Sequence, residues 1–197
     1  EDLPNTLVFR RDQIPTGRRD PRVVPNVFVP SILPVKVSSL QGFKPGKAMP
    51  DGMPNSKASV ICVAMQKGGV GKSTTAINLA GALAVTGSDV LFVDLDPQGN
   101  ASETLGFREE YMSESQSIYD ALVGSSDGDP DIDDLVVEHD EMDVIPAHRQ
   151  MVMARQDITD PTRLRSWLQN QKENWDHVVV DTPPSLGPVT DSAVLAG

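Results

Sequence analysis

The sequence predicts an α/β fold with a mainly parallel, twisted sheet flanked by helices. Short apolar runs with many β-branched residues, typical of buried strands, occur at 60–65, 90–93 and 178–180. Between the first two runs, residues 73–86 carry apolar side chains at helical spacing. Strands that alternate with helices are the pattern of a parallel sheet whose crossover connections are helical.

Local signals set the ends of the expected elements. Gly87 closes the first helix, and Asp160 followed by Pro161 is expected to begin a later helix as cap and first residue. Cys62 lies inside the first strand and is expected to be buried and inert. In chain order, we expect a strand at 60–65, a helix at 73–86, a strand at 90–93, a helix at 118–123, a strand at 142–145, a helix from 160 and a strand at 178–180.

Charge and proline divide the chain into two parts. Residues 1–57 hold nine basic and five acidic side chains, a net charge of +4, together with nine of the 16 prolines. We expect this proline-rich arm to be disordered or extended, either as a non-native leader or as a basic segment that touches nucleic acid or a partner. Residues 58–197 hold eight basic and 23 acidic side chains, a net charge of −15, and are expected to form the folded domain.

The composition excludes several classes of protein. A single cysteine excludes a disulfide framework and a cysteine-ligated metal centre within the chain. The three histidines are scattered without metal-ligand spacing, and no apolar run reaches the roughly 18 residues that a membrane helix needs. With no signal-peptide pattern at the N-terminus, we expect a soluble, cytoplasmic protein.

An acidic segment at 127–143 has nine acidic residues and no Lys or Arg. We expect a solvated surface loop there; the alternative is a metal site, although the spacing does not fit an EF-hand. The acidic domain has only three lysines, Lys67, Lys72 and Lys172. This bias suggests adaptation to high salt, which unfolding measured against KCl concentration would test.

A glycine-rich segment joins the first strand to the first helix. Glycines let successive backbone N–H groups turn toward one point and bind an anion, and the following helix adds its positive N-terminal end. Lys72 can reach outer phosphates, and the Ser73 hydroxyl can ligate Mg²⁺. The candidate nucleotide-binding residues are Lys67, Gly68, Gly69, Val70, Gly71, Lys72, Ser73 and Thr74.

Carboxylates follow two of the expected strands. Asp94 and Asp96 come at the end of the second strand, and Asp181 follows the run at 178–180. The carboxyl ends of parallel strands face the ligand crevice, so these side chains are expected to meet the glycine-rich loop. Like charges this close require a cation or a proton between them, which Mg²⁺ and an attacking water would supply.

These motifs resemble the ParA/MinD family of P-loop NTPases. Gln66 stands where the usual phosphate loop has its first glycine, and Lys67 is the additional lysine of the family's deviant Walker A motif. The sequences DPQGN at 96–100 and DTPPSLG at 181–187 resemble those of the ParA/Soj branch. The resemblance covers roughly 59–197 and implies a domain that is truncated at its C-terminus, with an unpaired edge on its sheet.

The resemblance also implies roles for single residues. Lys67, Lys72 and Asp96 would be catalytic: Lys67 would reach the ATP of a partner subunit, and Asp96 would orient or activate the hydrolytic water. Ser73, Asp94 and Asp181 would hold or support Mg²⁺.

The implied function is an ATP-driven switch for DNA segregation, with ATP and Mg²⁺ as cofactors. It would form a homodimer on ATP binding, bind DNA without sequence preference, respond to a ParB-like stimulating partner and associate with the nucleoid. A MinD-like or other cargo-positioning ATPase is one alternative. A nucleotide-binding regulator without turnover is the other, and the intact Lys72, Ser73, Asp96 and Asp181 argue against it.

Overall fold

The structure, a computed structural model, describes residues 58–113, 115–126, 128–171 and 174–197. The chain divides into two units, Glu1–Ser56 and Lys57–Gly197. The predicted proline-rich arm at 1–57 lies outside the described residues. Within the described part of the second unit, none of the helices has the length and hydropathy that a membrane span requires.

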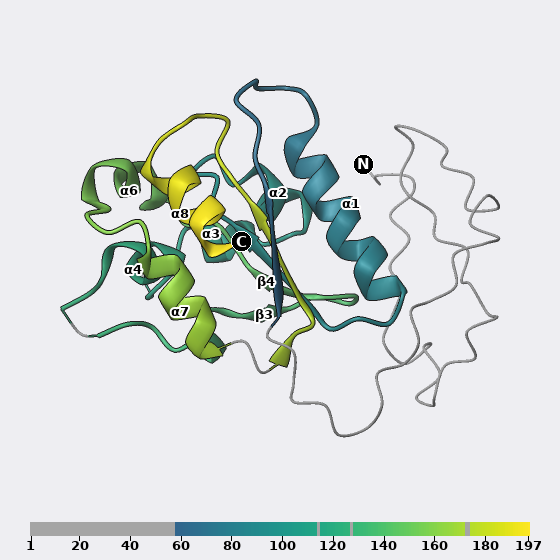
Figure 1. Ribbon diagram of the computed structural model, residues 1–197. Coiled ribbons are helices and arrows are strands. Elements are labelled where there is room, and N and C mark those ends of the chain that lie inside the picture. Colours follow the sequence, from purple (N-terminus) through teal and green to yellow (C-terminus); the bar gives the residue numbers. More distant parts are fainter. Residues whose placement is uncertain (1–57, 114, 127, 172–173) are drawn as a thin grey trace. The chain divides into compact units, whose positions relative to one another are not determined.

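The second unit is built on a five-stranded sheet (Figure 1). Its strand order is β1-β5-β2-β4-β3. β1, β5, β2 and β4 are parallel, and β3 alone runs antiparallel to its neighbour β4. The predicted mainly parallel α/β fold is thus confirmed. The strands are β1 Ser59–Val63, β2 Val90–Asp94, β3 Val137–Glu138, β4 Asp143–Ile145 and β5 His177–Asp181.

The strand register brings the predicted carboxylates together. Asp181 at the end of β5 is paired with Val63 of β1 on one side and with Asp94 of β2 on the other. The ends of three parallel strands therefore meet at one edge of the sheet, where the phosphate loop also begins. This is the edge at which ligands bind in open α/β sheets.

Helices cover both faces of the sheet (Figure 1). α1 packs on one face, and α4, α6, α7 and α8 lie on the other. The helices are α1 Lys72–Val85, α2 Asn100–Thr104, α3 Arg108–Tyr111, α4 Ile118–Val123, α5 Ile132–Leu135, α6 Met151–Asp157, α7 Arg163–Gln171 and α8 Pro188–Ala196.

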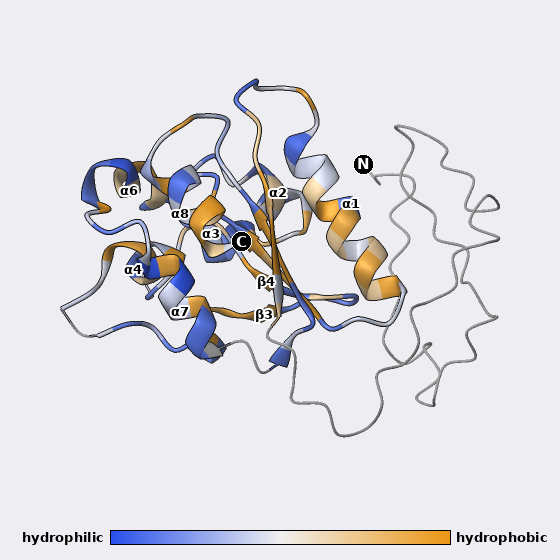
Figure 2. Cartoon of the chain, viewed as in Figure 1, coloured by the Kyte–Doolittle hydropathy of each residue, from blue (hydrophilic) through white to orange (hydrophobic). Residues whose placement is uncertain are grey.

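Strand alternation produces two hydrophobic cores. On β2, Leu91 and Val93 face the core of α4, α6, α7 and α8, whereas Phe92 faces the core beneath α1. On β5, Val178 and Val180 follow the first pattern and Val179 the second. Because successive side chains of a strand point to opposite faces, the runs at 90–93 and 178–180 in the two central strands are apolar on both faces. Figure 2 shows the resulting hydrophobic band through the middle of the unit.

Three local expectations are wrong in detail. The segment 127–143, expected to be a loop, contains α5 and β3, and Ile132 and Leu135 of α5 are buried in the core. The helix expected from Asp160 begins at Arg163, although Asp160 Oδ1 does accept the Thr162 amide at 2.8 Å as a cap would.

Cys62 is half-buried rather than buried. The cause is the position of β1 at one end of the strand order, which leaves four of its five residues half-buried and the first exposed. Partial burial is nevertheless the main cause that raises the pKa of the Cys62 thiol above its usual range. A raised pKa keeps the thiol protonated, as expected for an inert cysteine.

Candidate nucleotide-binding site

The phosphate loop connects β1 to α1 and is open to solvent. All residues from Ala64 to Gly71 are exposed. Gly69 and Gly71 adopt left-handed backbone conformations, with φ of 72° and 85°, that other residues rarely take. A Cβ added to Gly68, Gly69 or Gly71 would meet no atom within 4 Å. The loop therefore leaves room for a ligand to approach its backbone closely.

The N-terminus of α1 has the electrostatics of an anion site. Gly71 is the N-cap residue and makes no side-chain capping hydrogen bond, and the first turn contains no acidic residue. The helix dipole thus places partial positive charge at its start without a carboxylate of the first turn to balance it. Together with the open glycine loop, this arrangement can bind phosphate groups.

Lys72, the first residue of α1, lies between two carboxylates. Its Nζ donates to Asp181 Oδ1 at 2.6 Å and lies 3.8 Å from Asp96 Oδ2. It also lies within hydrogen-bond distance of Ser73 Oγ, at 3.3 Å. Lys72 is only 8% exposed, so these ion pairs are largely shielded from water. The lysine predicted to bind phosphates is therefore held by Asp96 and Asp181.

Asp181 supplies an acceptor that no hydrogen bond within the described residues satisfies. Its side chain is fully buried, and Oδ2 has no hydrogen-bond partner there, while Oδ1 accepts from Lys72. A buried unsatisfied acceptor is costly, which suggests that the atom serves a ligand. Thr182 fixes the end of the strand, since its hydroxyl donates to the Val63 carbonyl at 3.0 Å.

The oxygens near Lys72 fit a magnesium ion. Mg²⁺ prefers hard oxygen ligands and is usually held by one or two carboxylates together with substrate phosphates. Asp181 and Ser73 both lie against Lys72 Nζ and offer a carboxylate and a hydroxyl. The described residues contain no group of three or more His, Cys, Asp and Glu that could hold a metal ion unaided. An ion here would therefore depend on a bound nucleotide for further ligands.

Asp94 points into the protein, where both of its oxygens accept hydrogen bonds. Oδ1 accepts the Asp96 amide at 3.0 Å, and Oδ2 accepts the Ser102 amide and hydroxyl at 2.9 and 2.7 Å. The pKa of Asp94 is raised to about 6. Complete burial is the main cause and nearby Asp181 adds to it, whereas the hydrogen bonds from Ser102 oppose the shift. Support of the Mg²⁺ shell by Asp94 stays a prediction, because these contacts point toward the loop and α2.

Asp96 lies just beyond β2, in the loop that leads to α2. It is 4% exposed; Oδ1 accepts the Gln98 amide at 3.0 Å, which leaves Oδ2 facing Lys72. Burial is the main reason that the pKa of Asp96 is raised, while the Gln98 amide and Lys72 oppose the shift. A carboxylate with a raised pKa, held beside a phosphate-binding lysine, is suited to orient a water and accept its proton.

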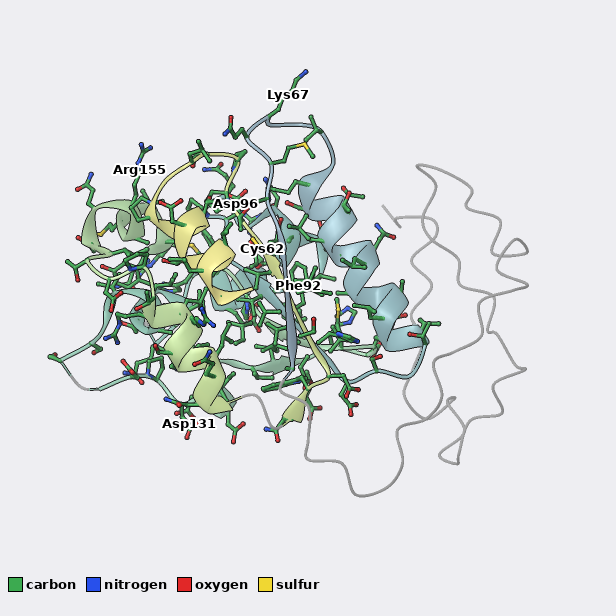
Figure 3. The ribbon with its side chains drawn as sticks, viewed as in Figure 1. Cys62, Lys67, Phe92, Asp96, Asp131 and Arg155 are labelled. Atoms are coloured by element: carbon green, nitrogen blue, oxygen red, sulfur yellow. The ribbon has the colours of Figure 1, made fainter. Side chains whose placement is uncertain are left out.

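The structure places Lys67 apart from the charged cluster. Lys72, Ser73, Asp96 and Asp181 meet at one point, whereas Lys67 is exposed on the phosphate loop. Figure 3 shows Lys67 pointing outward from the tip of this loop, away from Asp96. Lys67 is therefore accessible to a second molecule.

Two residues outside every predicted motif support the site. The Ser102 hydroxyl donates to Asp94 and accepts the Ala147 amide at 2.8 Å, so it ties α2 to the segment after β4. The Tyr111 hydroxyl donates to the Pro97 carbonyl at 2.8 Å. Neither contact has a sequence signal, since the partners are distant in the chain and neither residue has a special spacing.

A groove of about 670 Å³ lies beside the residues that follow β1. It is formed by the residues that directly follow β1 and β5, by Pro161 and by α8, and its lining is mainly apolar. Met65 and Leu186 in this lining are 50% and 63% exposed. Lys72, Asp96 and Asp181 do not line it, so the groove is separate from the charged cluster.

Comparison with known proteins gives a consistent result. Residues 58–197 match the family model described as an AAA domain. The chain is 43% identical to the sporulation initiation inhibitor protein Soj of Bacillus subtilis over 141 residues, 70% of this chain and 54% of that protein. It is 44% identical to the chromosome-partitioning ATPase Soj of Thermus thermophilus over 145 residues, 73% of this chain and 53% of that protein.

Solved structures are similar over the same region. A plasmid partition protein from Borrelia burgdorferi is 29% identical and superposes with a TM-score of 0.63, over 72% of this chain and 62% of that one. Cobyrinic acid a,c-diamide synthase from Mycobacterium smegmatis, solved with a bound ATP analogue and magnesium, is 32% identical with a TM-score of 0.64, over 71% and 57%.

The chain spans about half the length of the Soj proteins that it matches. The matching region contains every predicted site residue, from Lys67 to Asp181. The predicted resemblance to ParA/Soj-type ATPases is confirmed by these relatives. The chain belongs to the AAA domain family, and the Soj and ParA partitioning proteins are its relatives.

Proposed function

We propose that this protein binds and hydrolyses ATP as a molecular switch for DNA segregation. The observation that carries the proposal is the cluster of Lys72, Asp96 and Asp181 beside an open glycine loop and an uncompensated helix N-terminus. The name of the Thermus relative, a chromosome-partitioning ATPase, supports both the reaction and the process.

In this proposal the phosphates of ATP are bound by backbone amides of the phosphate loop and of the first turn of α1. Lys72 leaves Asp181 and contacts the outer phosphates. Ser73 and Asp181 Oδ2, which has no hydrogen-bond partner within the described residues, would hold Mg²⁺, in keeping with the magnesium in the Mycobacterium structure. When bound, the ion neutralises charge that builds up on the phosphates.

Asp96 is proposed to act on the attacking water. Its Oδ2 faces the cluster, while Oδ1 is fixed by the Gln98 amide. A water bound to Oδ2 would be oriented toward the terminal phosphate and could transfer its proton to the carboxylate. Burial of Asp96 favours this transfer because it raises the pKa of the carboxyl.

We further propose that ATP joins two copies of the protein through Lys67. The exposure of Lys67, away from its own cluster, supports a role in the partner's site. The dimer would bind DNA without sequence preference and a ParB-like partner would stimulate slow hydrolysis, as a cytoplasmic, nucleoid-associated protein. The net charge of −15 on residues 58–197 opposes DNA binding, so that binding would depend on locally clustered basic groups.

Three variants of the intact protein test the proposal. We expect Lys72→Ala to lose ATP binding, measured by titration calorimetry with Mg²⁺. Asp96→Ala should keep ATP-dependent dimerisation, measured by light scattering, but lose phosphate release. Lys67→Ala should bind ATP without forming dimers.

Specific outcomes would contradict parts of the proposal. Wild-type hydrolysis in Asp96→Ala would refute the role of Asp96. A wild-type protein that binds ATP without turnover would instead be a nucleotide-binding regulator, and ATP-dependent binding to lipid vesicles rather than DNA would indicate a MinD-like positioning ATPase.

A further inference from the structure

Tyr111, the last residue of α3, covers the loop that carries Asp96. Its hydroxyl donates to the Pro97 carbonyl at 2.8 Å. Its ring lies against Gly99, where an added Cβ would come within 2.9 Å of Tyr111 Cδ2. The tyrosine therefore contacts the loop at two residues that follow Asp96, once by a hydrogen bond and once by packing.

Asp94 holds the same loop from its other end. Asp94 Oδ1 accepts the Asp96 amide, and Asp94 Oδ2 is bound by Ser102. Within the loop, the Gln98 amide donates to Asp96 Oδ1 at 3.0 Å and the Gly99 amide to the Asp96 carbonyl at 2.9 Å. The position of the Asp96 carboxylate is thus determined by the backbone that Asp94 and Tyr111 hold between them.

Tyr111 is itself well anchored. Its carbonyl accepts the Arg149 amide at 3.2 Å, and its amide donates to the carbonyl of Phe107 at 3.4 Å. Phe107 is buried in the core beneath α1. Because Tyr111 is fixed to this core, its ring can hold the loop at Pro97 and Gly99 in one position.

We propose that Tyr111 is a positioning residue that fixes the Asp96 carboxylate for ATP hydrolysis. The proposal rests on the ATPase function proposed for this site. A carboxylate that orients water must stay within hydrogen-bond reach of it, and small displacements of such groups reduce the rate strongly. The Tyr111 hydroxyl bonds to Pro97 rather than to Lys72 or the glycine loop, so it should affect turnover rather than nucleotide binding.

The test compares the chain's two tyrosines in the intact protein. Tyr111→Phe removes the hydroxyl but keeps the ring on Gly99. Tyr119→Phe is the matched control, because it removes a hydroxyl that also makes one hydrogen bond. The Tyr119 hydroxyl, in α4, donates to Asp157 Oδ2, in α6, at 2.7 Å. We expect Tyr111→Phe to lower kcat about fivefold, equivalent to about 1 kcal/mol, with KM for ATP within about twofold. Tyr119→Phe should leave both constants unchanged.

A second measurement does not depend on turnover. Hydrogen exchange of the Gln98 and Gly99 amides should become faster in Tyr111→Phe and stay as in the wild type in Tyr119→Phe. Unchanged exchange, unchanged kcat or an equal loss of kcat in both variants would each overturn the proposal. A wild type without ATPase activity would refute the proposed function, and exchange alone would then decide whether Tyr111 fixes the loop.

Discussion

The phosphate loop at 66–71 and the acidic loop at 94–99 adjoin at the same edge of the sheet but are built in opposite ways. Every residue of the first is exposed, and its glycines face open space. In the second, Asp94, Asp96 and Gly99 are buried, and Gly99 is in contact with Tyr111. A loop that binds phosphates with its backbone needs room, whereas a loop that presents a single carboxylate needs rigidity.

The largest difference should appear between Lys72, which faces Asp96 of the acidic loop, and Lys67, which is exposed on the phosphate loop. We expect Lys72→Ala to lower the free energy of unfolding by about 3–5 kcal/mol at pH 7, because Asp181 would remain buried without its cation. Exposed Lys67 is the control, and Lys67→Ala should change stability by less than about 0.5 kcal/mol. Urea unfolding of the nucleotide-free protein measures both, and equal losses would contradict the structure.

Glycines of the two loops should also respond differently to alanine. Gly99 has φ of +61° and no room beside Tyr111, so Gly99→Ala should cost about 2–4 kcal/mol from backbone strain and overpacking. Gly68→Ala should leave the unfolding free energy within about 0.5 kcal/mol of the wild type. It should weaken ATP binding instead, because its Cβ would enter the open space. Urea unfolding and calorimetry separate the two effects, and a stable Gly99→Ala variant would refute the tight packing.

The buried acidic loop should make stability depend on pH. The folded protein raises the pKa of Asp94 from 3.8 to about 6, so between these values the folded state holds a proton that the unfolded state has released. Stability must therefore fall as pH rises from about 4 to 6, by about 2–3 kcal/mol from this group. Asp94→Asn should lack this contribution. The measurement is the free energy of unfolding against pH without magnesium, and parallel profiles of wild type and variant would contradict the role of Asp94.

The two loops also differ in how far the sequence predicted them. The phosphate loop depends on local chemistry, namely glycine conformations and a helix start, so its residues form one continuous segment that a pattern can mark. The contact of Tyr111 with Gly99 and the link from Ser102 to Ala147 join residues 12 and 45 positions apart. Such contacts follow from tertiary packing, which no local pattern encodes.

The sequence prediction also missed the short helix α5 within the acidic segment 127–143. At 127–143 the acidic side chains dominate the sequence and suggested a solvated loop. Only Ile132 and Leu135, spaced three residues apart, mark the turn of helix that packs on the core. The density of carboxylates outweighed this short apolar signal, because two residues are too few to define a helical period.

The ion pair of Lys72 with Asp181 has a consequence for how tightly nucleotide can bind. Lys72 is the cation beside Asp181, so this buried carboxylate is neutralised by a group of the protein itself. Binding then exchanges one counter-ion for another instead of adding charge to an empty site. We expect ATP without a divalent ion to bind weakly, because drawing Lys72 away would leave Asp181 unbalanced. We therefore expect nucleotide and Mg²⁺ to bind together more tightly than either binds alone.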